Sequence, residues 1–192
     1  MGNEAHPRGN RLPLRWIAVT SAGWLVGVVL VVLLSMAWDL VGGGAQFMVG
    51  VGMGVVVGLL QSRMIASWVT SGWHWFLAST IGMGIPYLLW DLGVGFGVSG
   101  LLAMWVCTVV GGVLVGVLQR PLFRAPRPRA GLWVVACAFG WSVPEWLLQL
   151  SNMGLLPGKW DLLSIAGVLF GGVLLGSVTS LALPRRLSRS AV

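Results

Sequence analysis

Three regularly spaced glycines constrain this chain strongly, because the same spacing recurs twice further along it. Gly50, Gly54 and Gly58 lie four residues apart, so in a helix they share one face and leave it without side chains. Gln61 adds an amide to the same stripe. The second copy comprises Thr108, Gly112, Gly116 and Gln119, and the third comprises Gly172, Gly176 and Thr179. The recurrence predicts three similar structural units.

A second pattern precedes each glycine stripe and follows nearly the same period. In this pattern a tryptophan is followed, at helical spacing, by a small residue and then by glycine or proline. The copies are Trp16, Thr20, Gly23 and Gly27, then Trp75, Ser79, Gly82 and Pro86, and finally Trp133, Cys137, Gly140 and Pro144. Each unit is therefore predicted to be a helical hairpin, and the chain to contain three hairpins in tandem.

The composition indicates a membrane protein. Hydrophobic residues make up 57% of the 192 residues and charged residues only 9%, too few to solvate the surface of a soluble domain. Apolar segments without charge cover residues 16–38, 41–60, 75–90, 92–118, 131–144 and 162–183. Because a membrane-crossing helix needs about 20 residues, we predict an all-α integral membrane protein. Its six transmembrane helices would form three tandem helical-hairpin repeats in a pseudo-threefold arrangement.

The basic residues predict the orientation of these spans. With six spans, eleven of the 12 basic residues fall on one side of the membrane, and only Lys159 falls on the other. Basic residues are enriched in cytoplasmic loops, so both termini are expected to be cytoplasmic. The net charge of +7 comes in short clusters beside the spans. A nucleic-acid-binding domain would instead carry a basic stripe, and no nucleic-acid partner is expected.

The predicted organisation has a tail, three repeats and a second tail. The parts are a cytoplasmic tail at 1–15, hairpin repeats at 16–66, 67–124 and 125–184, and a basic cytoplasmic tail at 185–192. The first tail is polar and proline-containing, and is expected to be disordered. Tandem glycine-rich hairpins marked by tryptophan resemble a type found among bacterial membrane proteins. The resemblance implies no particular activity. We expect a multi-pass protein of a bacterial-type inner (cytoplasmic) membrane.

The glycine stripes are interpreted as helix-packing faces, because lipid offers helices no hydrophobic reason to associate and glycine permits close backbone contact. The residues concerned are Gly50, Gly54, Gly58, Gly112, Gly116, Gly172 and Gly176. Their spacing does not decide between contacts within the chain and contacts with another subunit. The leading hypothesis is therefore a protein without catalytic activity. It would act as an accessory or scaffold subunit of a membrane assembly, or as a homo-oligomer.

Acidic residues recur at the outer ends of the predicted spans. The tripeptide Trp-Asp-Leu occurs three times and contains Asp39, Asp91 and Asp161. One interpretation is an interfacial anchor, in which tryptophan lies at the head groups and aspartate caps the next helix. The other is an acidic vestibule that concentrates cations, together with Glu145 in the outer third of the membrane.

Polar residues also recur at the cytoplasmic ends of the glycine helices. Gln61, Gln119 and Thr179 occupy matching positions there. Each can bond to a neighbouring helix, or the three can form a polar constriction. Together with the outer aspartates and Glu145, such a ring suits the alternative function of a small solute or ion transporter or channel.

The remaining polar residues are interpreted mainly as lipid-binding residues and not as catalytic ones. Anionic lipid head groups are candidate ligands of the loop that contains Arg120, Arg124, Arg127 and Arg129. His74 beside a span gives a second alternative, a pigment- or haem-binding subunit with one axial ligand. No cofactor or metal is predicted otherwise. We expect no enzymatic activity, because no catalytic triad, zinc pair or carboxylate cluster shares one depth in the membrane.

Overall fold

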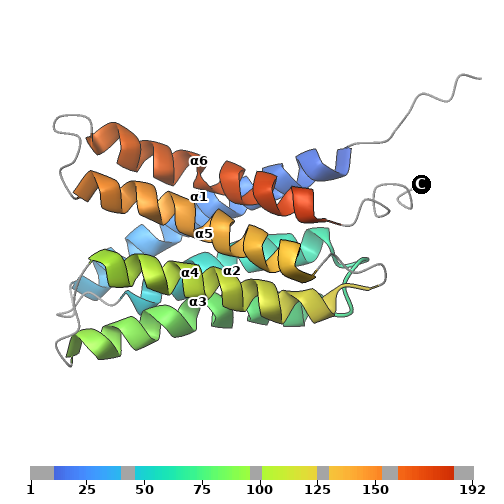
Figure 1. Ribbon diagram of the computed structural model, residues 1–192, viewed down its shortest axis with the longest axis horizontal. Coiled ribbons are helices and arrows are strands. Elements are labelled where there is room, and N and C mark those ends of the chain that lie inside the picture. The colour runs from blue at the N-terminus through green and yellow to red at the C-terminus, as the bar shows by residue number, and fades with distance from the viewer. Residues whose placement is uncertain (1–10, 40–45, 96–100, 125–129, 153–159, 184–192) are drawn as a thin grey trace, which may run out of the picture.

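The computed structural model describes residues 11–39, 46–95, 101–124, 130–152 and 160–183, and it is helical (Figure 1). Its helices are α1 (Arg11–Asp39), α2 (Phe47–Met64), α3 (Gly72–Gly95), α4 (Leu101–Gln119), the short 3-10 helix η1 (Arg120–Leu122), α5 (Ala130–Asn152) and α6 (Trp160–Ala182). The six long helices run side by side along the long axis of the molecule. The all-helical fold class is thereby confirmed.

Four helices of the described chain are long and apolar enough to cross a membrane: α1, α2, α4 and α6. Helices α3 and α5 have comparable lengths of 24 and 23 residues. Their tryptophans, hydroxyl-bearing residues and internal prolines make them less apolar, because these residue types transfer less favourably into hydrocarbon than leucine or valine does. The four apolar helices support the prediction of a membrane protein.

Two helix boundaries differ from those expected. Helix α1 begins at Arg11, so the last part of the segment expected to be a disordered tail is helical. Pro13 is compatible with this start, because an amide in the first turn has no partner within the helix. Helices α3 and α5 continue through Pro86 and Pro144 and extend beyond the apolar segments identified at 75–90 and 131–144. The tails at 1–10 and 184–192 lie outside the described residues.

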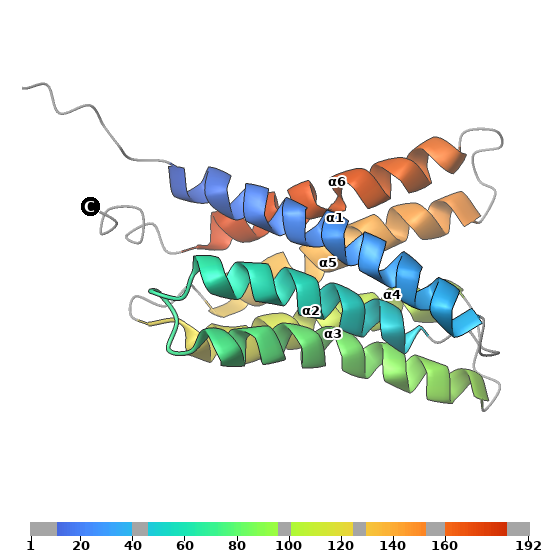
Figure 2. The ribbon, with the colours of Figure 1, turned by 180° about the vertical axis from the view of Figure 1, so that it is seen from behind.

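The helices form a closed ring. Each long helix packs against its neighbours in the sequence, and α1 also packs against α6. Figure 1 shows α3 to α6 from one side of the ring, and Figure 2 shows α1 and α2 on the reverse side. The first and last helices of the chain are therefore neighbours in space, as consecutive helices are.

The two ends of the ring differ in charge. The start of α1, the end of α6 and the α2–α3 connection lie at one end of the molecule (Figure 1). We call this the basic end, because Arg15, Arg63, Arg120 and Arg124 are exposed there. The opposite end is called the far end.

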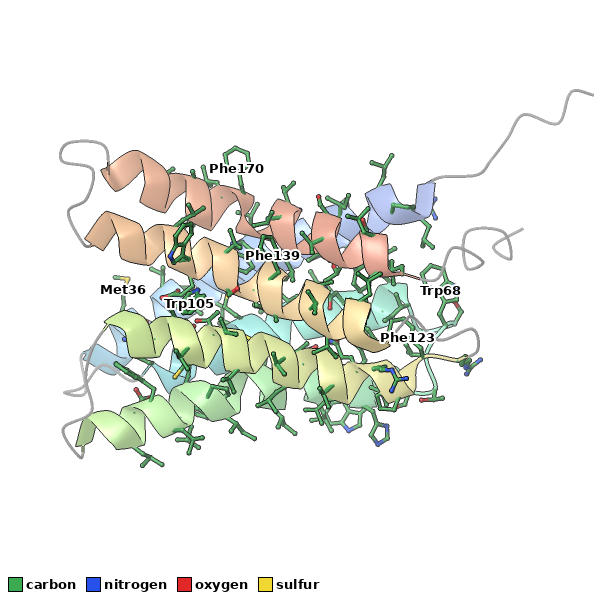
Figure 3. All side chains as sticks on the ribbon, viewed as in Figure 1. Met36, Trp68, Trp105, Phe123, Phe139 and Phe170 are labelled. Carbon is green, nitrogen blue, oxygen red and sulfur yellow. The ribbon has the colours of Figure 1, made fainter. Side chains whose placement is uncertain are left out.

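The outer surface of the ring is apolar. Phe139 of α5 and Phe170 of α6 project away from the bundle (Figure 3), with 51% and 63% of their surface exposed. Leu181 and Val135 are exposed as well. A contiguous surface of this kind is unfavourable in water and favourable against lipid chains.

Candidate functional site

The glycine stripes join each hairpin to the next. A Cβ atom on Gly54 of α2 would lie 2.6 Å from the Ser79 carbonyl oxygen of α3. Close contacts of this type bring Gly50, Gly54 and Gly58 against α3, Gly112 and Gly116 against α5, and Gly172 and Gly176 against α1. The stripes therefore pack between helices of the same chain, and the last of them closes the ring.

A complementary contact occurs within each hairpin. Gly23 of α1 packs against Val57 of α2, so that a Cβ atom on Gly23 would lie only 3.1 Å from the Val57 Cα. The same contact pairs Gly82 with Val115 and Gly140 with Leu175. Val57, Val115 and Leu175 have at most 2% of their surface exposed and belong to the hydrophobic core between the helices.

Four aromatic rings close the centre of the ring toward the basic end. We call Trp16, Trp75, Trp133 and Phe123 the aromatic plug; each is at most 1% exposed. The ring centroids of Trp16 lie 6.3 Å from those of both Trp75 and Trp133, which are 5.8 Å from each other. Phe123 lies 5.2 Å from Trp75 and 5.0 Å from Trp133. These separations are typical of packed aromatic pairs, so the rings pack against one another inside the bundle.

The connection between α2 and α3 supports the plug from outside. The Thr70 amide donates to the Leu122 carbonyl oxygen at 2.7 Å, and the Arg124 amide donates to the Trp68 carbonyl oxygen at 2.8 Å. These bonds flank Phe123 on both sides. Figure 3 shows Trp68 and Phe123 together at this end of the molecule. The backbone thus holds Phe123 against the tryptophans.

The predicted ring of Gln61, Gln119 and Thr179 serves the contacts between helices. The Trp75 Nε1 donates to the Gln61 Oε1 at 3.4 Å, and the Gln61 Nε2 donates to the Thr20 Oγ1 at 3.1 Å. Further bonds run from Gln119 Nε2 to Ser79 Oγ at 2.9 Å and from Trp16 Nε1 to Thr179 Oγ1 at 2.8 Å. Each of the three polar side chains is buried and bonded to a neighbouring helix.

Nearer the far end than Val57, Val115 and Leu175, the helices surround a chamber of about 180 Å³, and all six long helices contribute to its lining. Most of the lining is apolar and comes from valines of α1 and α2 and from Met53 and Met83. Trp24 and Trp141 form an aromatic pair in the wall, with centroids 5.8 Å apart and planes inclined at 41°. The chamber is partly open.

Among the described lining residues, Tyr87, Thr108 and Glu145 bring hydroxyl and carboxyl groups to the chamber. The Thr108 hydroxyl donates to the Met104 carbonyl oxygen at 3.1 Å, so the Tyr87 hydroxyl, 3.0 Å away, donates to Thr108. The carboxyl group of Glu145 lies within electrostatic range of the Tyr87 hydroxyl. Glu145, which the sequence placed in the outer third of the membrane, is half-buried at the chamber wall.

The wall between α1 and α6 differs from the other seams. The Trp24 indole lies against Gly171 and Gly172 of α6, and its Nε1 donates to the Val168 carbonyl oxygen at 2.8 Å. Beyond this point the two helices diverge toward the far end (Figure 2). Helices α2 and α3, by contrast, are still in close backbone contact at Gly50, near the start of α2.

Asp91 caps a helix, but not the one expected. Its carboxylate accepts hydrogen bonds from the amides of Gln46 at 2.9 Å and Phe47 at 2.7 Å, at the start of α2. The sequence suggested a cap on the following helix. Because α3 continues past Asp91 to Gly95, the carboxylate lies beside the preceding, antiparallel helix. The side chains of Asp39 and Asp161 lie outside the described residues, so the structure does not describe an acidic ring.

Those of the other candidate residues that the structure describes lie on the surface. Arg120 and Arg124 are exposed at the basic end, and Arg127 and Arg129 fall outside the described residues. His74 is exposed, and its amide donates to the Ser71 hydroxyl at 3.3 Å. Among the described residues there is no group of three or more His, Cys, Asp or Glu side chains that could hold a metal ion.

Sequence analysis did not identify the chamber. Trp24, Met83 and Trp141 each follow a repeated glycine, and Val28, Tyr87 and Glu145 each follow the next repeat position one turn later. This alignment was the available signal. Comparison with protein families, with curated proteins and with solved structures gives no significant match.

Proposed function

We propose that this protein binds a small solute in the chamber, as a non-enzymatic, six-span protein of a bacterial-type inner membrane. The observation that carries the proposal is a partly open chamber to which all six long helices contribute lining residues. A concave, mostly apolar site with a few converging polar groups is the usual form of a small-molecule site.

Six spans are supported by the ring itself. At 1.5 Å per residue, α3 and α5 are about 36 and 34 Å long, enough to cross a hydrocarbon core of about 30 Å. Both lie in the same ring as the four apolar helices. The contacts of Gly54, Gly112 and Gly172 recur at matching positions, which supports three tandem hairpin repeats.

The orientation follows from the basic end. Exposed arginines at one end of a helical membrane protein favour a cytoplasmic location for that end. Both termini are then cytoplasmic, the aromatic plug faces the cytoplasm, and the chamber lies in the outer half of the membrane.

Specific contacts favour solute binding over the hypotheses of a scaffold subunit and of a channel. The glycine stripes are occupied by helices of the same chain, so they do not support assembly with other subunits. Gln61, Gln119 and Thr179 are engaged in hydrogen bonds beside the plug and not in the chamber wall. A continuous polar path for a channel therefore lacks support in the described part of the ring.

Cysteine accessibility tests the proposal. In a background with Cys107→Ala and Cys137→Ser, single cysteines are introduced as Val31→Cys in the chamber wall, Thr70→Cys at the basic end and Phe170→Cys on the lipid-facing surface. Right-side-out vesicles are treated with a neutral, water-soluble thiol reagent that does not cross membranes.

We expect the Val31→Cys variant to react in right-side-out vesicles, Thr70→Cys only in inverted vesicles, and Phe170→Cys in neither. A Val31→Cys thiol that is unreactive from the outer side would contradict the proposed chamber. Reaction of Thr70→Cys from the outer side would contradict the proposed orientation.

A further inference from the structure

Two tryptophans occupy equivalent places in the chamber wall. Trp24 and Trp141 lie eight residues after Trp16 and Trp133, respectively, in the first and third predicted repeats. Both line the chamber, and at most 7% of the surface of either residue is exposed. The structure therefore allows two indole groups at matching positions to be compared.

The two indoles differ in their hydrogen bonding. The Trp24 Nε1 donates to the Val168 carbonyl oxygen at 2.8 Å, whereas the Trp141 Nε1 has no acceptor among the described residues. Of the side-chain nitrogen and oxygen atoms in the described chain, Trp133 Nε1 is the one that is both fully buried and unbonded. The Trp141 Nε1 therefore keeps contact with open space, and the space that its ring lines is the chamber.

The other polar groups of the described lining are already engaged. The Tyr87 hydroxyl donates to Thr108, and the Thr108 hydroxyl donates to the Met104 carbonyl oxygen. Glu145 takes part in an interaction of its own. An indole N–H can only donate, and it is unfavourable to remove it from water without an acceptor. A ligand that matches the Trp141 N–H must therefore carry a hydrogen-bond acceptor.

The rest of the lining favours an uncharged ligand with an apolar body. Valines, Met53 and Met83 supply most of the wall, and none of the described lining residues is basic. Such a surface does not replace the water around an ion. The volume of about 180 Å³ is similar to that of engineered cavities of about 150 Å³ that hold benzene. One six-membered ring therefore fits the chamber.

We propose that the chamber binds a small, uncharged, mostly apolar molecule whose carbonyl oxygen accepts a hydrogen bond from the Trp141 Nε1. A carbonyl oxygen satisfies the indole without adding a donor that would need a partner in turn. This inference rests on the proposed function, since it names the class of solute for the same chamber.

Cyclohexanone and methylenecyclohexane form a matched pair of probes. The two molecules have the same ring and differ in one position, where the oxygen of the ketone is replaced by a CH₂ group. Each is tested in right-side-out vesicles for its ability to slow modification of the Val31→Cys variant by the neutral thiol reagent. The same measurements are made after adding Trp141→Phe, or Trp24→Phe as the control.

The measured quantity is the ratio of the concentrations of the two probes that halve the modification rate. Partition of the probes into the bilayer is the same for each variant, so it cancels when the ratios are compared. We expect Trp141→Phe to reduce the preference for cyclohexanone about threefold to tenfold, the usual effect of one hydrogen bond. Trp24→Phe should leave the preference unchanged, because the Trp24 N–H is bonded to Val168.

A second measurement needs no substitution in the chamber wall. In the native chain labelled with ¹⁵N at tryptophan, one indole N–H resonance should move on addition of cyclohexanone and move less with methylenecyclohexane. Its absence from the spectrum of Trp141→Phe would assign it. Helical content and elution volume identify any variant that misfolds, and the native spectra then decide the question.

The failures are distinguishable. An unchanged preference in Trp141→Phe, an equal loss in Trp24→Phe, or native spectra without a ketone-specific shift would overturn the inference and leave a chamber for other solutes. Absence of protection by either probe, with Val31→Cys still reactive, would also overturn the inference alone. An unreactive Val31→Cys thiol would overturn both the inference and the proposed function.

Discussion

Gly112 of α4 lies against Ala138 of α5 so closely that a Cβ atom on the glycine would be 2.7 Å from the alanine Cα. The neighbouring atoms are backbone, which cannot move aside as a flexible side chain can. Gly112→Ala is therefore expected to force α4 and α5 apart and to destabilise the protein by about 1–3 kcal/mol. Thermal unfolding in detergent, followed by circular dichroism, measures the change.

Gly131 supplies the control for that substitution. It lies at the start of α5, and a Cβ atom there would meet nothing within 4 Å. Gly131→Ala is expected to leave the stability unchanged or to raise it by up to about 1 kcal/mol, because alanine is the better helix former. Equal losses in both variants would show that the α4–α5 contact is not as close as described.

Trp75 and Trp133 make a matched pair for measuring one buried hydrogen bond. The Trp75 Nε1 donates to Gln61, whereas the Trp133 Nε1 is buried without an acceptor among the described residues. Replacing either by phenylalanine removes similar volume from the plug. We expect Trp75→Phe to lose about 0.5–1.5 kcal/mol more than Trp133→Phe in unfolding experiments. The opposite order would indicate that the Gln61 bond does not contribute to stability.

Gln61 connects three helices through its amide. Gln61→Leu removes the acceptor of Trp75 and the donor to Thr20, leaving two buried polar groups with one partner fewer. The expected loss is about 1–2 kcal/mol, since hydrogen bonds between membrane helices are individually modest. A double-mutant cycle with Trp75→Phe checks the assignment. Additive effects of the two substitutions would contradict a direct interaction.

Asp91 stabilises the beginning of α2 from a different helix. Asp91→Ala removes the acceptors of the Gln46 and Phe47 amides, and we expect a loss of about 1 kcal/mol. Amide hydrogen exchange should increase in the first turn of α2 and remain unchanged at its end near Met64. Asp91→Asn retains one acceptor oxygen and should lose less. Uniform exchange along α2 in Asp91→Ala would exclude a local capping role.

The sequence pattern predicted much of the architecture because the relevant forces are local. Glycines four residues apart define a face without side chains, and the lack of charge between them predicts burial in lipid. The spacing of Gly54 or Gly172 does not determine which helix packs against that face, because this depends on the tertiary structure. The contacts with Ser79 and Ser21 within one chain appear only in the structure.

The chamber was not predictable for a related reason. Its size depends on the side chains that meet at the centre of the ring, and these come from helices far apart in the sequence. The sequence distinguished Trp24 only by its position after the repeated Gly23. In the structure its indole packs against Gly171 and Gly172 of α6 and also lines the chamber. Likewise Asp91 was predicted to be a cap, but its partner depends on where α3 ends.

The bond between Trp16 and Thr179 spans 163 residues of chain, from the first helix to the last. Synthesis proceeds from the N-terminus, so α1 is made before α6. Until α6 has been inserted, the Trp16 indole therefore lacks its Thr179 acceptor. A nascent chain halted after α5 would thus expose Trp16, Thr20 and Trp24 to lipid at an unfinished edge. Quality-control proteases of the membrane would have a recognisable feature by which to distinguish incomplete chains from mature ones.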